Sequence, residues 1–224
     1  YMHFLHPNQE FAAIGGSRAL GVEHERSDID LLIVANIFNR DIRYKTGYNT
    51  LYESPNELYS IITSTDNGYI HAMQYFYPQE FVTDNEFTDW IKANRDALIE
   101  ENKYAIYSAV VRYVNTAKER FRIYYKIARK RVLYALCYGE MCRKYASGTA
   151  MVDCVRATGE WREWLGNVRT GNISQDETYD KLCEICAALD EILANTADSV
   201  EKPVTAEFKE IIDSTKFDNY ADRL

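Results

Sequence analysis

The chain has 224 residues, 46% of them hydrophobic and 27% charged, which places it among folded globular proteins rather than disordered ones. Its net charge of −8 at pH 7 excludes a protein that coats nucleic acid through a broadly basic surface. The apolar runs are shorter than a membrane span, no secretory segment is present, and five cysteines do not make an even disulfide framework. We therefore expect a cytoplasmic protein without a membrane partner.

The first 87 residues carry the signals of short strands and turns. An apolar run at 10–14 ends at a glycine pair, and the β-branched run at 29–37 is typical of a buried strand. A third strand is expected at 48–52, closed by the proline that follows, with a helix at 58–64 capped by the two residues before it. Residues 1–87 are therefore predicted to form an α/β domain with a short mixed sheet.

From residue 88 onward the apolar residues recur at spacings of three and four, which is typical of helices. Breaks are expected at Gly148, the Gly166-Asn167 pair and Gly171, and Ser174 begins a helix with acids in its first turn. Helices are expected at about 87–99, 104–122, 124–145, 151–168, 176–194 and 205–213. The fold class is therefore predicted to be α+β, with a helical bundle over residues 88–224.

Asp28 and Asp30 begin the strongly apolar run at 29–37. One residue separates them, so on a strand both carboxylates project from the same face. Two neighbouring carboxylates repel each other unless a cation lies between them, and hard oxygen donors suit Mg²⁺ together with substrate phosphates. This pair is our candidate metal site.

Gly15, Gly16 and Ser17 follow the first apolar run. Glycine lets the backbone approach an anion closely, and the serine adds a hydroxyl at the start of a short helix. A lone Gly-Gly-Ser turn or a lone Asp-x-Asp pair is usually structural. Here the glycine turn ends one apolar run and the acidic pair begins the next. Their order together predicts a site for a metal-bound triphosphate.

Ile14-Gly-Gly-Ser-Arg-Ala-Leu-Gly21 followed by Ser27-Asp-Ile-Asp-Leu-Leu-Ile33 resembles the minimal nucleotidyltransferases of the DNA polymerase β superfamily. The resemblance implies that Ser17 contacts phosphate, with Gly16 in the same turn, and that Arg18 lies near the nucleotide. It also implies that Asp28 and Asp30 ligate Mg²⁺ or Mn²⁺.

The activity implied is transfer of a nucleoside monophosphate from a nucleoside triphosphate such as ATP, with release of pyrophosphate. The acceptor hydroxyl could belong to an RNA or tRNA end, a protein or a small molecule, and the sequence does not choose among them.

The superfamily pattern also has a third carboxylate on a neighbouring strand. Our candidate is Glu53, at the end of the predicted third strand, and Asn49 lies on the same face by alternation. Asp41 is a weaker candidate, expected in a connecting loop. If the family position falls on Asn49, the site lacks its base, and the alternative is a catalytically impaired nucleotide sensor or regulatory module.

A basic segment at 118–131 stands out in this acidic chain. Lys118, Arg122, Lys126 and Lys130 repeat every four residues and make one stripe on a helix. The stripe either faces the cleft, where Lys126 and Lys130 would bind triphosphate or a nucleic-acid backbone, or is a solvated face.

Three other groups of residues are interpreted as structural. The aromatic segment at 69–77 favours packing between domains over stacking on a base, and His71 within it favours packing as well. The lone CxxC of Cys183 and Cys186 lies in a helical pattern and reads as two thiols on a core face. His24, between the two halves of the motif, is the histidine closest to the predicted chemistry.

Overall fold

The computed structural model describes residues 11–37, 41–45, 47–65 and 73–217, and for residues 41–45, 122 and 124–128 it describes the backbone alone. In chain order the elements are β1 (Phe11–Ile14), α1 (Gly16–Ala19), β2 (Ile29–Val34), β3 (Asp41–Lys45), β4 (Tyr48–Glu53), α2 (Pro55–Thr63), α3 (Met73–Phe76), β5 (Glu80–Phe81), α4 (Glu86–Glu101), α5 (Lys103–Ala146), α6 (Met151–Val155), α7 (Gly159–Thr170), α8 (Gln175–Ala194) and α9 (Pro203–Ser214). A small sheet followed by helices confirms the predicted α+β class.

The described strands form one mixed sheet in the order β3-β4-β2-β1-β5. Strands β2 and β4 are parallel, and the other neighbouring pairs are antiparallel. β3 was not expected, because residue 41 was placed in a loop, and the two-residue β5 is too short to leave a sequence pattern. The central β2 is buried at four consecutive residues, as its continuous apolar run requires.

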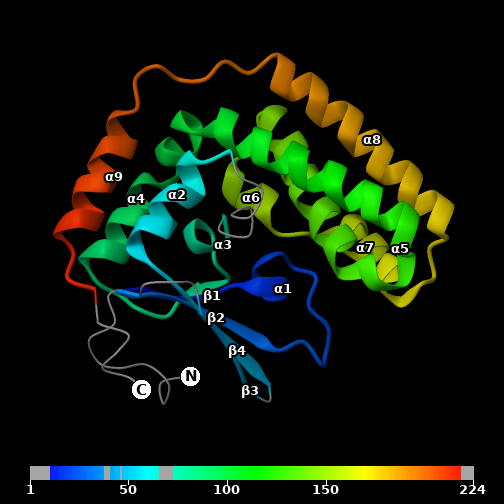
Figure 1. Cartoon of the computed structure of the whole chain (residues 1–224), viewed down its shortest axis with the longest axis horizontal. Coiled ribbons are helices and arrows are strands. Elements are labelled where there is room, and N and C mark those ends of the chain that lie inside the picture. Colours follow the sequence, from blue (N-terminus) through cyan, green and yellow to red (C-terminus); the bar gives the residue numbers. More distant parts are fainter. Residues whose placement is uncertain (1–10, 38–40, 46, 66–72, 218–224) are drawn as a thin grey trace.

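Side chains alternate between two apolar clusters across the sheet. Leu32 and Val34 belong to the large cluster shared with the helices, whereas Leu31 and Ile33 belong to a small cluster on the opposite face. Figure 1 shows the helices gathered on one side of the sheet, with the long α5 running alongside α8. The main core therefore lies between one face of the sheet and the helices. The boundary predicted between residues 87 and 88 falls inside α4 and stays a prediction.

Helix α5 joins two helices that the sequence predicted separately, at 104–122 and 124–145. The apolar spacing is interrupted near Ile123, whose exposed fraction is 68%. Neither glycine nor proline occurs at that point, so the helix continues through it. The predicted break at Gly148 is confirmed, because this residue has φ +93 one residue after the C-cap.

The helix predicted at 151–168 is instead two helices, α6 and α7. Gly159 has φ +55, which allows the chain to turn before α7 begins. The predicted break at Gly166 is wrong, because this glycine lies inside α7, whereas Gly171 is the left-handed C-cap of that helix. Helix α2 begins at Pro55, and its N-cap is Ser54 rather than the two residues expected, because proline fits the first turn of a helix.

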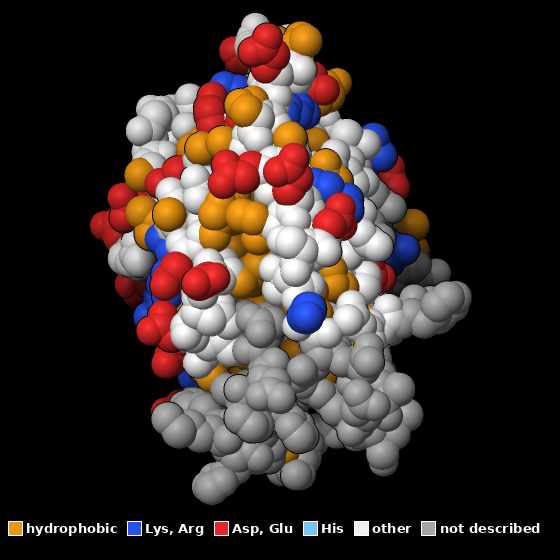
Figure 2. Space-filling model, turned by 90° about the vertical axis from the view of Figure 1, so that its left-hand side faces the viewer, with side chains coloured by type: hydrophobic (Ala, Val, Ile, Leu, Met, Phe, Trp, Pro, Cys, Tyr) orange, Lys and Arg blue, Asp and Glu red, His pale blue; other side chains and the backbone are white. Residues whose placement is uncertain are grey.

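The surface on the α9 side of the molecule is acidic. Figure 2 shows Asp and Glu side chains outnumbering Lys and Arg side chains on this face, with apolar side chains between them. This distribution agrees with the net charge of −8. Across the described residues, every helix is too short or too polar to cross a bilayer.

Candidate active site

The two halves of the sequence motif meet where β1 ends and β2 begins. These strands are antiparallel neighbours with Ile14 opposite Leu31, so the turn after β1 lies beside the start of β2. The Gly15 N–H donates to the carbonyl oxygen of Asp30 at 2.8 Å. The strand register therefore brings the glycine turn and the acidic pair together.

Gly16 packs directly against the side chain of Asp30. Its φ of +64 lies in the left-handed region that favours glycine. A Cβ atom on Gly16 would lie 1.7 Å from Asp30 Oδ2 and 2.5 Å from Asp30 Cγ. Any other residue at position 16 would therefore have to displace this carboxylate.

Asp28 and Asp30 lie at the solvent edge of the face that the helices cover. Asp30 has the same parity as Leu32 and Val34, which belong to the main apolar cluster. Asp30 is half-buried, whereas Asp28 precedes the strand and is exposed. Both carboxylates are thus open to a ligand that enters from solvent, beside the helices.

The residue opposite Asp30 on the neighbouring strand is Asn49, not Glu53. In the parallel pairing of β2 and β4, Asn49 faces Asp30 and donates through Nδ2 to Asp30 Oδ1 at 2.8 Å. Glu53 pairs with Val34, four residues farther along and therefore about 13 Å away at 3.3 Å per residue. Glu53 is buried there with 1% of its surface exposed. The register does not bring this predicted third carboxylate to the acidic pair. The weaker candidate, Asp41, begins β3 and has only its backbone described.

Gln74 is a site residue that the sequence did not single out. Its Oε1 accepts the N–H of Gly16 at 2.5 Å, and its Nε2 donates to the hydroxyl of Tyr138 on α5 at 2.9 Å. Both Gln74 and Tyr138 are buried. The signal that could have found it is a polar residue inside the apolar segment 73–77. The other residues of this segment are buried in the core, so packing is confirmed for this part of the predicted aromatic cluster, whereas His71 lies outside the described residues.

Arg18 lies in α1, directly after the glycine turn, and reaches the loop between the motif halves. One terminal nitrogen donates to the carbonyl oxygen of Ser27 at 3.2 Å. Its Nε is buried and has no hydrogen-bond partner among the described residues. An unpaired buried donor on a guanidinium is costly, and an anionic ligand would supply the missing acceptor. Ser17 beside it is 6% exposed.

Tyr134 of α5 closes the site from the helical side. Burial raises the pKa of its hydroxyl, and the negative charge of Asp30 raises it further, whereas Arg169 lowers it. Tyr134 therefore lies near both Asp30 and Arg169. The exposed Lys130 lies one turn earlier, with Nζ 5.8 Å from the centroid of the Tyr134 ring. Lys130 is thus the residue of the predicted basic stripe whose described side chain lies near the motif.

The rest of that stripe is spread along α5. Lys118 lies twelve residues before Lys130, about 18 Å along the helix, and interacts with Cys186 of α8. Cys186 is buried and Cys183 is half-buried, in agreement with their interpretation as thiols on a core face. The side chain of Lys126 lies outside the described part of the structure, so its place relative to the site stays a prediction.

The loop that joins the motif halves is held by helix α7 and the turn before it. Glu23 Oε1 forms salt bridges with Nη2 of Arg156, at 3.2 Å, and with Nη2 of Arg162, at 3.0 Å. Arg169 donates a hydrogen bond to the carbonyl oxygen of Val22. A mainly apolar cavity of about 340 Å³ lies between this loop and α7. Its lining includes His24, whose Nδ1 accepts the backbone N–H of Arg26 at 2.9 Å. The helical half therefore fixes the loop that carries the motif.

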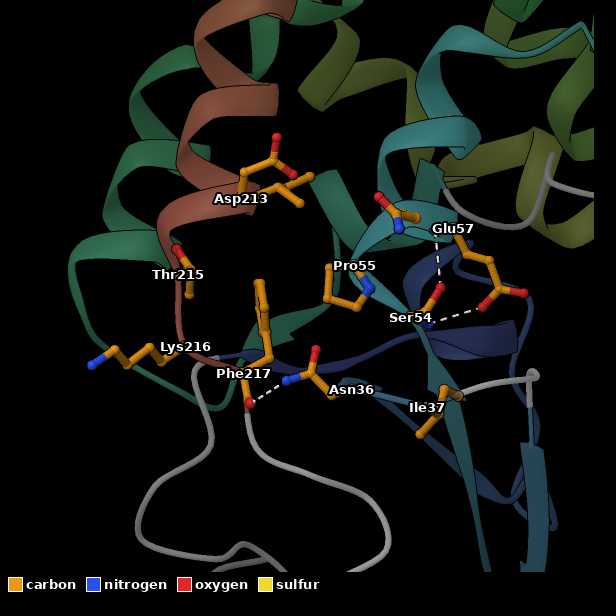
Figure 3. Close-up of a pocket in the computed structure, with 11 residues that line it drawn as sticks. Asn36, Ile37, Ser54, Pro55, Glu57, Asp213, Thr215, Lys216 and Phe217 are labelled. Carbon is orange, nitrogen blue, oxygen red and sulfur yellow. Dashed lines mark hydrogen bonds between the residues drawn. The ribbon is translucent and has the colours of Figure 1, made fainter.

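A larger cavity, of about 1040 Å³, lies at the opposite end of β2. Figure 3 shows the amide of Asn36 directed at the carbonyl of Phe217, to which it donates at 2.7 Å, and the capping interactions of Ser54 with Glu57. None of the motif residues lines this cavity. It is therefore separate from the acidic pair.

The residues of the motif suit a divalent cation. Within the described residues no group of three or more His, Cys, Asp or Glu side chains could hold a metal, so the donors considered in this part of the chain are the two carboxylates of Asp28 and Asp30. Mg²⁺ is commonly held in this way, by one or two carboxylates together with phosphate oxygens. Gly16 keeps the space beside Asp30 Oδ2 free of side-chain atoms. The donor set therefore fits a metal that arrives with a triphosphate.

A family model described as a nucleotidyltransferase domain matches residues 2–134, more than half of the chain. The match includes the glycine turn, the acidic pair, the whole sheet and most of α5 up to Tyr134. A search among curated proteins finds no match.

Proposed function

The chain belongs to the nucleotidyltransferase domain family, a family of transferases, and from that premise we propose that it transfers a nucleoside monophosphate from a nucleoside triphosphate to an acceptor hydroxyl. Pyrophosphate is the leaving group, and the reaction depends on Mg²⁺ or Mn²⁺. The observation that carries this proposal is the contact between the Gly16 backbone and the Asp30 carboxylate, because it puts a phosphate-binding turn beside a metal-binding side chain.

Each residue of the motif has a separate role in the proposal. Gly16 and Ser17 form the turn that receives the phosphates, and Arg18 donates its unpaired Nε to a phosphate oxygen. Asp28 and Asp30 hold the divalent ion. When bound, the ion neutralises charge on the phosphates and on the departing pyrophosphate. The chain itself supplies positioning and charge rather than covalent chemistry.

The helical half contributes to the same site. Lys130 carries a positive charge beside the Tyr134 ring, where we propose that it attracts the triphosphate or an anionic acceptor. Lys126, one turn earlier on α5, is proposed to extend this surface. The double variant Lys126→Ala/Lys130→Ala should weaken nucleotide or acceptor binding without lowering the free energy of unfolding. Unchanged binding would assign both lysines to the solvated surface.

A second candidate function is favoured by Asn49. Its neutral amide lies where a carboxylate could ligate the metal or accept the proton of the attacking hydroxyl. A chain that binds the metal–nucleotide complex but lacks this base would act as a nucleotide sensor or a regulatory module. The two candidates share the binding site and differ in whether transfer follows.

The test uses each labelled nucleoside triphosphate with Mg²⁺ or Mn²⁺ and two separate acceptor pools, total RNA and a low-molecular-weight cell extract. Labelled product that disappears in Asp28→Ala/Asp30→Ala supports the enzyme and identifies the acceptor class. Metal-dependent nucleotide binding without product, together with transfer gained in Asn49→Asp, supports the sensor. Absence of metal-dependent nucleotide binding would contradict both.

A further inference from the structure

Helix α7 has a second functional face, away from the motif loop. On this face Trp161 and Trp164, one turn apart, stack with their ring centroids 5.2 Å apart and their planes 7° from parallel. Both rings are half-buried and pack against the main core on one side. Together they form the apolar floor of a groove of about 550 Å³ between α7 and α8. This volume lies within the range of about 300–1000 Å³ that is typical of small-molecule sites.

The walls of this groove are strongly acidic. Its lining contains four carboxylates and a single cation: Glu160, Glu177, Asp180, Glu184 and Lys181. The cation is already engaged, because Lys181 Nζ lies 2.7 Å from Glu184 Oε2.

The remaining carboxylates are less compensated. Glu177 accepts the indole N–H of Trp164 at 3.4 Å. Glu160 and Asp180 are exposed and have no ion pair within the described part of the chain. The groove therefore combines aromatic rings with uncompensated negative charge.

We propose that this groove binds a small organic polycation that carries alkylammonium groups, such as a polyamine. An ammonium group within about 6 Å of an indole ring is attracted to its π-electrons, and tryptophan is the strongest partner for this interaction. The carboxylates of the groove add Coulomb attraction. Because there are several of them, they attract a ligand with several positive charges more strongly than a ligand with one. An anionic ligand would be repelled by these walls and a neutral one would gain no Coulomb attraction, which is why charge complementarity favours a cation.

The site is separate from the nucleotidyltransferase motif. Trp161 and Trp164 face α8, whereas Arg162 and Arg169 on the same helix hold the motif loop. Residues of the groove can therefore be changed without touching the motif, and the proposal does not depend on nucleotide transfer.

Tryptophan fluorescence can measure ligand binding in the groove. The chain has three tryptophans, and Trp90 stacks on Phe208, outside the groove. In a Trp90→Phe background, the remaining signal comes from the groove. Titration with spermidine should change this fluorescence in a saturable way. The double variant Glu160→Gln/Asp180→Asn should raise the Kd by about tenfold, because two charges next to the ligand are lost.

A matched variant controls for non-specific charge. Glu163→Gln/Asp190→Asn removes the same net charge from exposed residues of the same two helices outside the groove, and its Kd should change by less than about twofold because solvent screens distant charges. An equal loss of affinity in both double variants would overturn the proposal. So would an equal fluorescence change with Mg²⁺ alone, or saturation by a lysine-rich peptide but not by spermidine.

Discussion

Replacement of Gly16 by alanine tests the central contact of the site. The alanine must adopt φ +64, which costs about 1–2 kcal/mol for a residue with a Cβ atom. Its Cβ would also lie 1.7 Å from Asp30 Oδ2, so the carboxylate must move, and such overpacking costs about 1–3 kcal/mol more. We expect the free energy of unfolding to fall by about 2–5 kcal/mol and metal-dependent nucleotide binding to be lost.

Gly47 provides the matched control. It also has a positive φ, +85, but a Cβ atom there would meet nothing within 4 Å. Gly47→Ala should therefore carry the backbone cost alone, about 1–2 kcal/mol, and bind Mg²⁺ and nucleotide as the unaltered chain does. Urea unfolding gives the stability of both variants, and a thermal shift with a non-hydrolysable triphosphate and Mg²⁺ gives the binding. Normal binding by Gly16→Ala would refute the role assigned to this contact.

Three further predictions concern other parts of the structure. Gln74→Leu should cost about 1–3 kcal/mol, because the buried N–H of Gly16 loses its acceptor; a urea unfolding curve equal to that of the unaltered chain would contradict this. Gly139→Ala should destabilise the chain, since its Cβ would lie 2.3 Å from a methyl group of α8. Gly166→Ala should instead stabilise α7 by up to about 1 kcal/mol, because its Cβ meets nothing within 4 Å. Equal melting temperatures of the two variants would show that the α5–α8 contact is looser than described. Burial raises the pKa of Tyr113 to about 12, above its unfolded value near 10, so between these pH values the native state keeps a proton that the unfolded chain loses. The free energy of unfolding should therefore decline as the pH rises from 10 toward 12. In Tyr113→Phe this decline should be less steep.

Local spacing was enough to predict most of the fold. Apolar periodicity located the sheet-bearing half, the helices and the end of α5 near Gly148, because these depend on neighbouring residues. It did not predict that α5 is continuous, since the apolar spacing is interrupted near the exposed Ile123 although the helix does not break there. Gly166 shows the reverse case, because a single glycine is tolerated inside a helix that packing holds.

The sequence predicted the part of the site that lies within the motif, but not the residues outside it. Gly16 and Asp30 are brought together by the pairing of adjacent strands, as their order in the sequence suggests. The choice between Asn49 and Glu53 depended on the register of β4 against β2, and both residues satisfy the same alternation. Gln74 depends on a contact with a residue 58 positions away, which no local pattern records.

The hydrogen bonds from Gly16 through Gln74 to Tyr138 connect the glycine turn directly to α5. A shift of α5 against the sheet at Tyr138 would strain these two buried hydrogen bonds or displace the turn. The turn lies beside the Asp30 carboxylate. We therefore expect substitutions that shift α5 at Tyr138 to change the position of the Gly16 backbone relative to Asp30, although they lie outside the motif.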